Sequence, residues 1–194
     1  MKLIWKGKMT TDNLFIPDNI PDSAKMLSSE KYTWLAYLLV VPILAIAYAG
    51  IVIRRPYVVG IAFNKIAFFI GVGLSIVFLV VHELIHALCC PRDTTVFVYL
   101  TSSGIGCVPA CGLKKNRYLL VALMPTIVLG VIPFIIWICF PGMNVIISSI
   151  LFAFSVGSLS MCVGDIYNAF LAAFKMNRRS VLVTSKTDIY YYNE

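Results

Sequence analysis

Charged residues are scarce in this chain of 194 residues: only 13% are Asp, Glu, Lys or Arg, whereas 60% are hydrophobic. A soluble domain carries about 25% charged residues, so the composition excludes a water-soluble globule. It also excludes intrinsic disorder, which requires low hydrophobicity. The mean hydropathy of +0.88 is typical of a protein that crosses the membrane several times.

Four long runs are almost free of charged residues, and each is long enough to cross a hydrocarbon core of roughly 30 Å. The expected fold is therefore an all-α integral membrane protein with four transmembrane helices. We expect the helices over residues 34–53, 66–90, 118–140 and 145–174. This membrane domain, residues 34–174, lies between an N-terminal tail, 1–33, and a C-terminal tail, 175–194.

Lys and Arg are absent from the third connection, residues 141–144. Thirteen of the sixteen Lys and Arg lie in the two tails and the second connection. The positive-inside rule then places both termini in the cytoplasm of a multi-pass cell-membrane protein. A cleaved signal peptide ending near residues 47–49 is the alternative for the first run, but the run continues past that site. Because the net charge of +7 is spread over tails and loops, no nucleic-acid partner is expected.

The second connection contains a pattern typical of strands. Thr94 to Leu100 is rich in β-branched and aromatic residues, and Ile105 to Ala110 could return as a second strand after a turn at residues 102–106. We expect a small hairpin on the cytoplasmic side between the second and third helices.

Histidine occurs only twice, and both copies belong to the sequence His82-Glu83-Leu84-Ile85-His86. Residues four apart share one face of a helix, so both imidazoles can bind one zinc ion while Glu83 reaches a metal-bound water. The alternative is a pair of buried histidines that hydrogen-bond to neighbouring helices. Ionisable groups inside a bilayer are costly and usually mark function, and three of them within five residues favour a shared divalent metal.

Acidic residues are equally rare in the apolar runs: of nine in the chain, only Glu83 and Asp165 lie there. A catalytic zinc takes three protein ligands and a water, so Asp165 is the third ligand by elimination. His82 and Asp165 each lie about 15 Å from the cytoplasmic end of their helices, which allows them to meet. Asn168, on the same helix face as Asp165, could donate to an oxyanion or hydrogen-bond to a helix backbone.

The six cysteines allow two interpretations. Cys89, Cys107 and Cys111 could form a second, structural metal site, but their spacing is loose. Otherwise the cysteines are small buried hydrophobes or free cytoplasmic thiols.

The chain resembles a bacterial membrane family of zincin peptidases, which is similar to the site-2 proteases. The resemblance covers residues 66–174 and rests on the motif at residues 82–86, a strand-like stretch ahead of a helix with Pro125, and a Gly-Asp pair. Site-2 proteases usually place Gly after the aspartate, whereas Gly164 precedes it here. The resemblance implies that His82, His86 and Asp165 are zinc ligands and that Glu83 is the catalytic carboxylate.

We therefore expect an intramembrane zinc metalloprotease that hydrolyses membrane-associated or transmembrane peptides with a water activated by zinc and Glu83. Its partners would be a membrane protein or peptide substrate and the lipid bilayer, and the strand at residues 105–110 could hold the substrate by strand addition. One alternative is a metal-binding but non-proteolytic accessory or immunity protein. Another is a transporter component or helical bundle without metal, although a single acidic site offers little for a transport path.

Overall fold

The computed structural model describes residues 1–17, 20–58, 63–101 and 104–193. The chain is 57% helix and 21% strand, and its strands form one sheet of three and one of four. The expectation of an all-α protein is therefore wrong. The reason is tertiary: both terminal segments, expected as tails, contribute strands that pair with segments far away in the sequence.

The helices form four columns. The first column consists of a 3₁₀ helix η1 (Glu30–Leu39), α1 (Val40–Arg54) and a second, short 3₁₀ helix η2 (Arg55–Tyr57), and the second column consists of α2 (Lys65–Val77) and α3 (Leu79–Cys89). The third column consists of α4 (Lys115–Pro125), a π-helical segment η3 (Thr126–Val131) and α5 (Ile132–Cys139). The fourth column consists of α6 (Val145–Met161) and α7 (Val163–Lys175).

Among the described residues, two helical stretches, Trp34–Tyr57 and Lys115–Cys139, are long and apolar enough to cross a membrane. The number of candidate spans rises to four if α2 with α3 and α6 with α7 each form one span. Large apolar side chains are exposed on these helices: Ile66 on α2 is 75% exposed and Phe69 is 72% exposed. Such surfaces suit contact with lipid, and they indicate membrane association.

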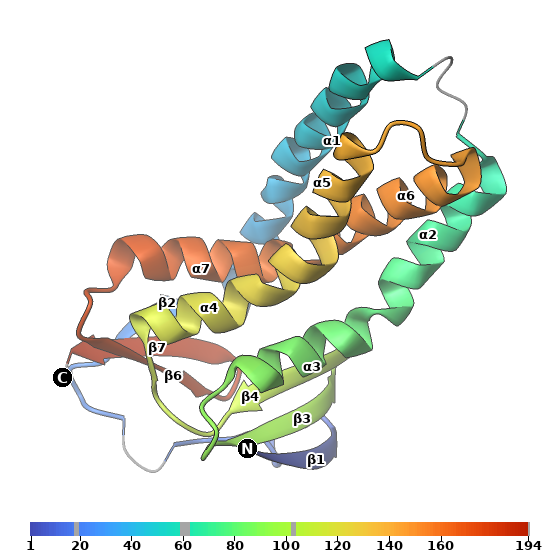
Figure 1. Cartoon of the computed structure of the whole chain (residues 1–194). Coiled ribbons are helices and arrows are strands. Elements are labelled where there is room, and N and C mark those ends of the chain that lie inside the picture. The colour runs from blue at the N-terminus through green and yellow to red at the C-terminus, as the bar shows by residue number, and fades with distance from the viewer. Residues whose placement is uncertain (18–19, 59–62, 102–103, 194) are drawn as a thin grey trace.

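The second and fourth columns are broken, where the sequence predicted continuous helices. The bend is 40° between α2 and α3 and 51° between α6 and α7. Phe78 and Cys162 lie at these breaks with ψ angles of 0° and 5°, outside the helical range. Neither position holds Gly or Pro, so the sequence gives no local signal for the bends. Both bends turn the second half of the column, α3 or α7, across the sheets (Figure 1).

The three-stranded sheet has the order β1–β3–β4, with β1 (Lys2–Lys8) parallel to β3 (Thr95–Thr101) and β3 antiparallel to β4 (Gly104–Pro109). Strands β3 and β4 form the hairpin predicted between the second and third columns, although its turn at residues 102–103 lies outside the described residues. The N-terminal segment extends this hairpin to a sheet.

The four-stranded sheet has the order β2–β7–β6–β5 and is antiparallel throughout. Its strands are β2 (Lys25–Ser28), β5 (Leu113–Lys114), β6 (Ser180–Ser185) and β7 (Asp188–Asn193). Three consecutive tyrosines, residues 190–192, lie in β7, where aromatic residues have high β-propensity.

Both sheets lie on one side of the molecule, together with both termini, and α3, α4 and α7 lie between the sheets and the other helices (Figure 1). Small side chains allow these three helices to approach one another: Ala87, Ala122, Ala169 and Ala172 are all at most 4% exposed and belong to one core cluster. Leu113 and Leu182 of the four-stranded sheet also belong to this cluster. The packing thus places α3 and α7 beside α4, which positions the site.

Candidate metal centre

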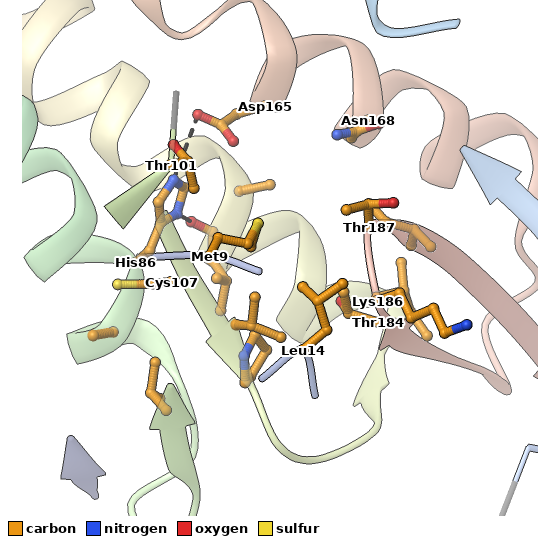
Figure 2. Close-up of a pocket in the computed structure, with 18 of the residues that line it drawn as sticks. Met9, Leu14, His86, Thr101, Cys107, Asp165, Asn168, Thr184, Lys186 and Thr187 are labelled. Carbon is orange, nitrogen blue, oxygen red and sulfur yellow. Dashed lines mark hydrogen bonds and ion pairs between the residues drawn. The ribbon is translucent and has the colours of Figure 1, made fainter. Parts of the chain in front are cut away.

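A cavity of about 1050 Å³ lies where α3, α4 and α7 face the two sheets. Its walls include His86 from α3 and Asp165 from α7, with Thr101 of β3 and Thr184 of β6 on the sheet side (Figure 2). Lys8 at the end of β1 lines it as well, together with four residues that follow this strand, Met9, Thr10, Thr11 and Leu14. A volume of this size is typical of pockets that hold a ligand.

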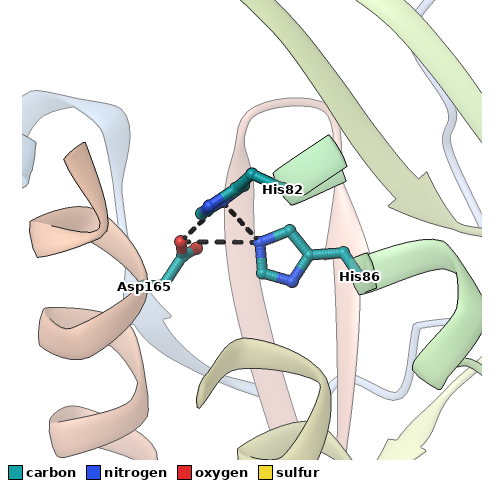
Figure 3. A group of neighbouring side chains, drawn as sticks. All are labelled: His82, His86 and Asp165. Carbon is teal, nitrogen blue, oxygen red and sulfur yellow. Dashed lines mark hydrogen bonds and ion pairs between the residues drawn. The ribbon is translucent and has the colours of Figure 1, made fainter. Parts of the chain in front are cut away.

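The two histidines of α3 point toward Asp165 of α7 (Figure 3), and of these three residues His86 and Asp165 line the cavity. The two rings lie on one helix face, as the four-residue spacing predicted, with centroids 4.6 Å apart. The bends at Phe78 and Cys162 do not prevent the predicted meeting of the two helices, because α3 and α7 both pack against α4.

Three atoms converge at this point. Oδ2 of Asp165 lies 3.1 Å from Nε2 of His82 and 3.4 Å from Nε2 of His86. The two Nε2 atoms are 3.0 Å apart. One ligand atom from each of the three residues lies within 4.8 Å of the others, and His82 is only 6% exposed.

The protonation of His86 follows from its other ring nitrogen. Nδ1 of His86 lies 2.8 Å from the carbonyl oxygen of Val121 on α4, and a carbonyl can only accept a hydrogen bond. Nδ1 must therefore carry the proton, and Nε2 of a neutral His86 presents a lone pair to Asp165 and His82. Oxygen and nitrogen lone pairs that face one another at these distances repel unless a proton or a metal cation lies between them. Two imidazoles and a carboxylate suit zinc.

Nδ1 of His82 has a different partner, the sulfur of Cys162, at 3.5 Å. Cys162 is 1% exposed and lies at the break between α6 and α7. The sequence analysis missed both Nδ1 partners, although each had a signal. Cys162 precedes Asp165 by three residues and so shares its helix face. Val121 precedes Pro125 by four residues, and at this spacing a proline leaves the carbonyl of the earlier residue without its helical N–H donor.

Glu83 lies beside the cluster, with Oε1 3.8 Å from Nε2 of His82. Its side chain is 17% exposed, so it is close to the converging atoms and not sealed from water. This placement is the one expected of a carboxylate that handles a proton next to a metal.

Asn168 lies one turn beyond Asp165 on α7 and lines the same cavity (Figure 2). Its side-chain oxygen Oδ1 is buried and has no hydrogen-bond partner within the part of the chain that the structure describes. A buried polar atom without a partner is costly, and the residue that carries it belongs to the cavity wall.

The cysteines do not form a second cluster of ligands among the described residues, where only His82, His86 and Asp165 converge. The Cys111 thiol instead forms a hydrogen bond of 3.2 Å with Thr94, and the Cys107 thiol donates to the Glu83 carbonyl at 3.5 Å. Burial raises the pKa of the Cys107 thiol, so it is neutral, whereas zinc binds the thiolate.

A family model with the description "Putative zincin peptidase" matches residues 75–181, more than half of the chain. The chain belongs to this zincin peptidase family. The matched segment of this zincin peptidase begins in α2, ends in β6 and contains all three residues of the cluster and its neighbour Glu83. No curated protein and no solved structure matches the chain.

Membership in the zincin peptidases indicates metallopeptidase activity and implies zinc as the metal. The donor set supports this metal independently, because three acceptor atoms from two imidazoles and a carboxylate meet at one point.

Proposed function

We propose that this zincin peptidase is an intramembrane zinc metalloprotease of the site-2-protease type. His82, His86 and Asp165 would hold the zinc ion, and Glu83 would be the catalytic carboxylate. The observation that carries the proposal is the convergence of three acceptor atoms, with Glu83 Oε1 3.8 Å from one of them, at the wall of a large cavity.

Zinc, when bound, lowers the pKa of a water molecule toward ~7 and polarises a carbonyl. Glu83 then takes a proton from the attacking water and later delivers it to the amine of the leaving peptide. The two histidines keep their geometry through hydrogen-bond partners on elements outside α3, which limits reorganisation during the reaction.

Asn168 would contribute from the same cavity wall. Its amide could donate to the oxyanion that develops on the scissile carbonyl, while its unpartnered Oδ1 accepts from a peptide N–H of the substrate. Both interactions require the substrate to be extended next to α7.

Strand β4 offers a place for such an extended peptide. It is the last strand in the order β1–β3–β4, and Cys107, Val108 and Pro109 of β4 line the cavity. Strand addition supplies backbone hydrogen bonds without regard to side chains, and Pro109 interrupts the row of donors on β4. A transmembrane or membrane-associated peptide that is locally unwound would fit this edge.

The membrane placement rests on the apolar columns. We propose that residues 34–174 form the membrane domain of a cell-membrane protein, with both termini and the sheets on the cytoplasmic side. The distribution of Lys and Arg supports this orientation, and both termini lie on the same side of the molecule (Figure 1).

The test compares the wild type with Glu83→Gln in detergent or liposomes, using a panel of transmembrane peptides. We expect cleavage to fall by roughly 10³-fold in the variant while its zinc content stays unchanged, because glutamine cannot take the proton. Undiminished cleavage would refute the catalytic role of Glu83. Zinc in the wild type without cleavage of any peptide would instead favour a metal-binding accessory or immunity protein.

A further inference from the structure

The Nδ1 atom of each histidine in the metal centre lies beside a group at an irregular position of a neighbouring helix. In a regular helix the carbonyl of residue i accepts from the N–H of residue i+4. The acceptor for His86 is the carbonyl of Val121, and residue i+4 is Pro125, which has no N–H.

The next backbone donor does not replace the missing one. The N–H of Thr126 bonds to the carbonyl of Leu123 instead, and the helix continues through the π-helical segment η3. The Val121 carbonyl is thus left with an unused lone pair inside a packed core, where Val121 is 7% exposed. His86 supplies the missing donor from α3 at 2.8 Å.

His82 lies beside a different helix irregularity, the break between α6 and α7. Its Nδ1 lies 3.5 Å from the sulfur of Cys162, the residue at which α6 ends and α7 begins. The backbone N–H of Cys162 bonds to the carbonyls of Ser158 and Leu159, so the break itself does not depend on the thiol. In the His82 tautomer that leaves Nε2 unprotonated, Nδ1–H donates to the Cys162 sulfur.

We propose that Pro125 and Cys162 are positioning residues of the metal centre, which fix His86 and His82 in the tautomer that presents Nε2 to the metal. This inference rests on the proposed zinc site. Partners of the non-ligating nitrogen typically change metal affinity by roughly 10- to 100-fold when they are removed. The partners here are a carbonyl released by proline and a thiol, in place of a carboxylate.

The decisive experiment measures zinc affinity by competition with a chelator in the full-length protein. Pro125→Ala restores an N–H that competes for the Val121 carbonyl, so we expect zinc affinity to fall roughly tenfold. Alanine also favours a helix more than proline does, so the thermal midpoint of the metal-free protein should stay the same or rise. A purely structural role for Pro125 would lower the midpoint and leave the affinity unchanged.

A matched control lies in the same column. Pro133, in the first turn of α5, is the other proline of that span, and neither histidine bonds to the carbonyl four residues before it. Pro133→Ala should leave zinc affinity unchanged. Equal losses for the two proline variants would overturn the proposal, because they would reflect a general effect on the span.

Cys162 is tested in the same assay. Cys162→Ala should lower zinc affinity by a similar factor, and Cys162→Ser, which keeps an acceptor, should recover part of it. Cys139→Ala is the control, since Cys139 is exposed on α5. Identical affinity in Cys162→Ala and the wild type would overturn the assignment of Cys162.

Proton NMR with ¹⁵N-labelled histidine gives a readout that needs no variant. The chain has only two histidines, so we expect two hydrogen-bonded Nδ1–H signals in the wild type. The spectrum of Pro125→Ala should lack the signal of His86 and retain the signal of His82. Signals from Nε2–H instead would overturn the proposal even if the variants failed to fold. A wild type without zinc would refute the proposed function, whereas equal zinc affinity in wild type and variants would refute only the positioning roles.

Discussion

Each end of the helical columns holds a charged side chain among the helices, Arg54 at one end and Asp165 at the other, and the two side chains have opposite kinds of partner. Away from the sheets, Arg54 at the end of α1 is 7% exposed and donates to Ser148 Oγ and to the carbonyls of Phe140 and Pro141. Its guanidinium also lies 4.6 Å from the ring of Trp137. The donors of Arg54 therefore meet acceptors and a π face, which joins α1, α5 and α6.

On the side of the sheets, Asp165 meets Nε2 atoms of two histidines, of which His86 at least offers a lone pair when it is neutral. Within the described residues Asp165 forms ion pairs with no Lys or Arg. The difference teaches how to separate structural from functional polar groups in a membrane protein. A charged donor group whose neighbours are acceptors stabilises the fold. Acceptor atoms that face one another instead indicate a site for a cation.

The largest effect should come from the end with converging acceptors. His86→Ala removes one of three ligands, so we expect loss of stoichiometric zinc and of peptidase activity, with the metal-free protein as stable as the metal-free wild type. Elemental analysis, a cleavage assay and thermal unfolding measure the three quantities. If His86→Ala unfolds in the absence of metal, the cluster serves the fold as Arg54 does and the contrast between the two ends disappears.

The opposite pattern is expected at the other end. Arg54→Leu leaves the carbonyls of Phe140 and Pro141 without this donor, whereas the Ser148 hydroxyl keeps the hydrogen bond from Trp137. Each buried carbonyl without a donor costs about 1–3 kcal/mol, so the free energy of unfolding should fall by about 3 kcal/mol. The zinc content of the folded fraction should not change. Loss of zinc at full stability would show that Arg54 acts on the metal centre.

The contrast between the two ends was only partly visible in the sequence. The histidine pair and Asp165 could be predicted because helix periodicity is local and only two acidic residues lie in the apolar runs. The close approach of His82, His86 and Asp165 agrees with that prediction. The role of Arg54 was not predicted, since its partners lie 86 to 94 residues away in the sequence.

The strands contributed by both terminal segments were missed for the same reason. Strand β1 pairs with β3, more than 90 residues further along the chain, and β2 pairs with β7 at the other terminus. Each segment carries only a weak local pattern, and its partner is set by tertiary structure. The breaks at Phe78 and Cys162 likewise depend on how α3 and α7 pack against α4, because neither residue is a helix breaker.

A smaller effect sharpens the description of the end that carries the metal centre. Asn168→Ala removes a donor from the cavity wall but no metal ligand, so kcat should fall by about 10²-fold while zinc affinity is unchanged. A steady-state assay of the variant with a cleaved peptide measures the effect. An unchanged kcat would leave Asn168 as a packing residue and limit the catalytic region to Glu83 and the three ligands.

The smallest effect tests the close packing of α2 against α6. A Cβ at Gly71 would press against the carbonyl of Ile150 and lie 2.8 Å from Cβ of Ala153. Gly71→Ala should therefore lower the free energy of unfolding by roughly 1–3 kcal/mol and leave zinc affinity unchanged.

Gly73, two residues further on α2, is the matched control because a Cβ there meets nothing within 4 Å. Gly73→Ala should be neutral, or stabilising by up to about 1 kcal/mol through helix propensity. Equal destabilisation by both variants would contradict the assignment of close contact to Gly71.

The most direct test of the central claim is the number of zinc ions per chain in purified wild-type protein, measured beside Asp165→Asn. The substitution keeps the shape of the side chain and removes its negative charge. We predict one zinc ion in the wild type and a strongly reduced content in the variant. A wild type without zinc, or a variant that retains a full equivalent, would contradict the metal centre described above.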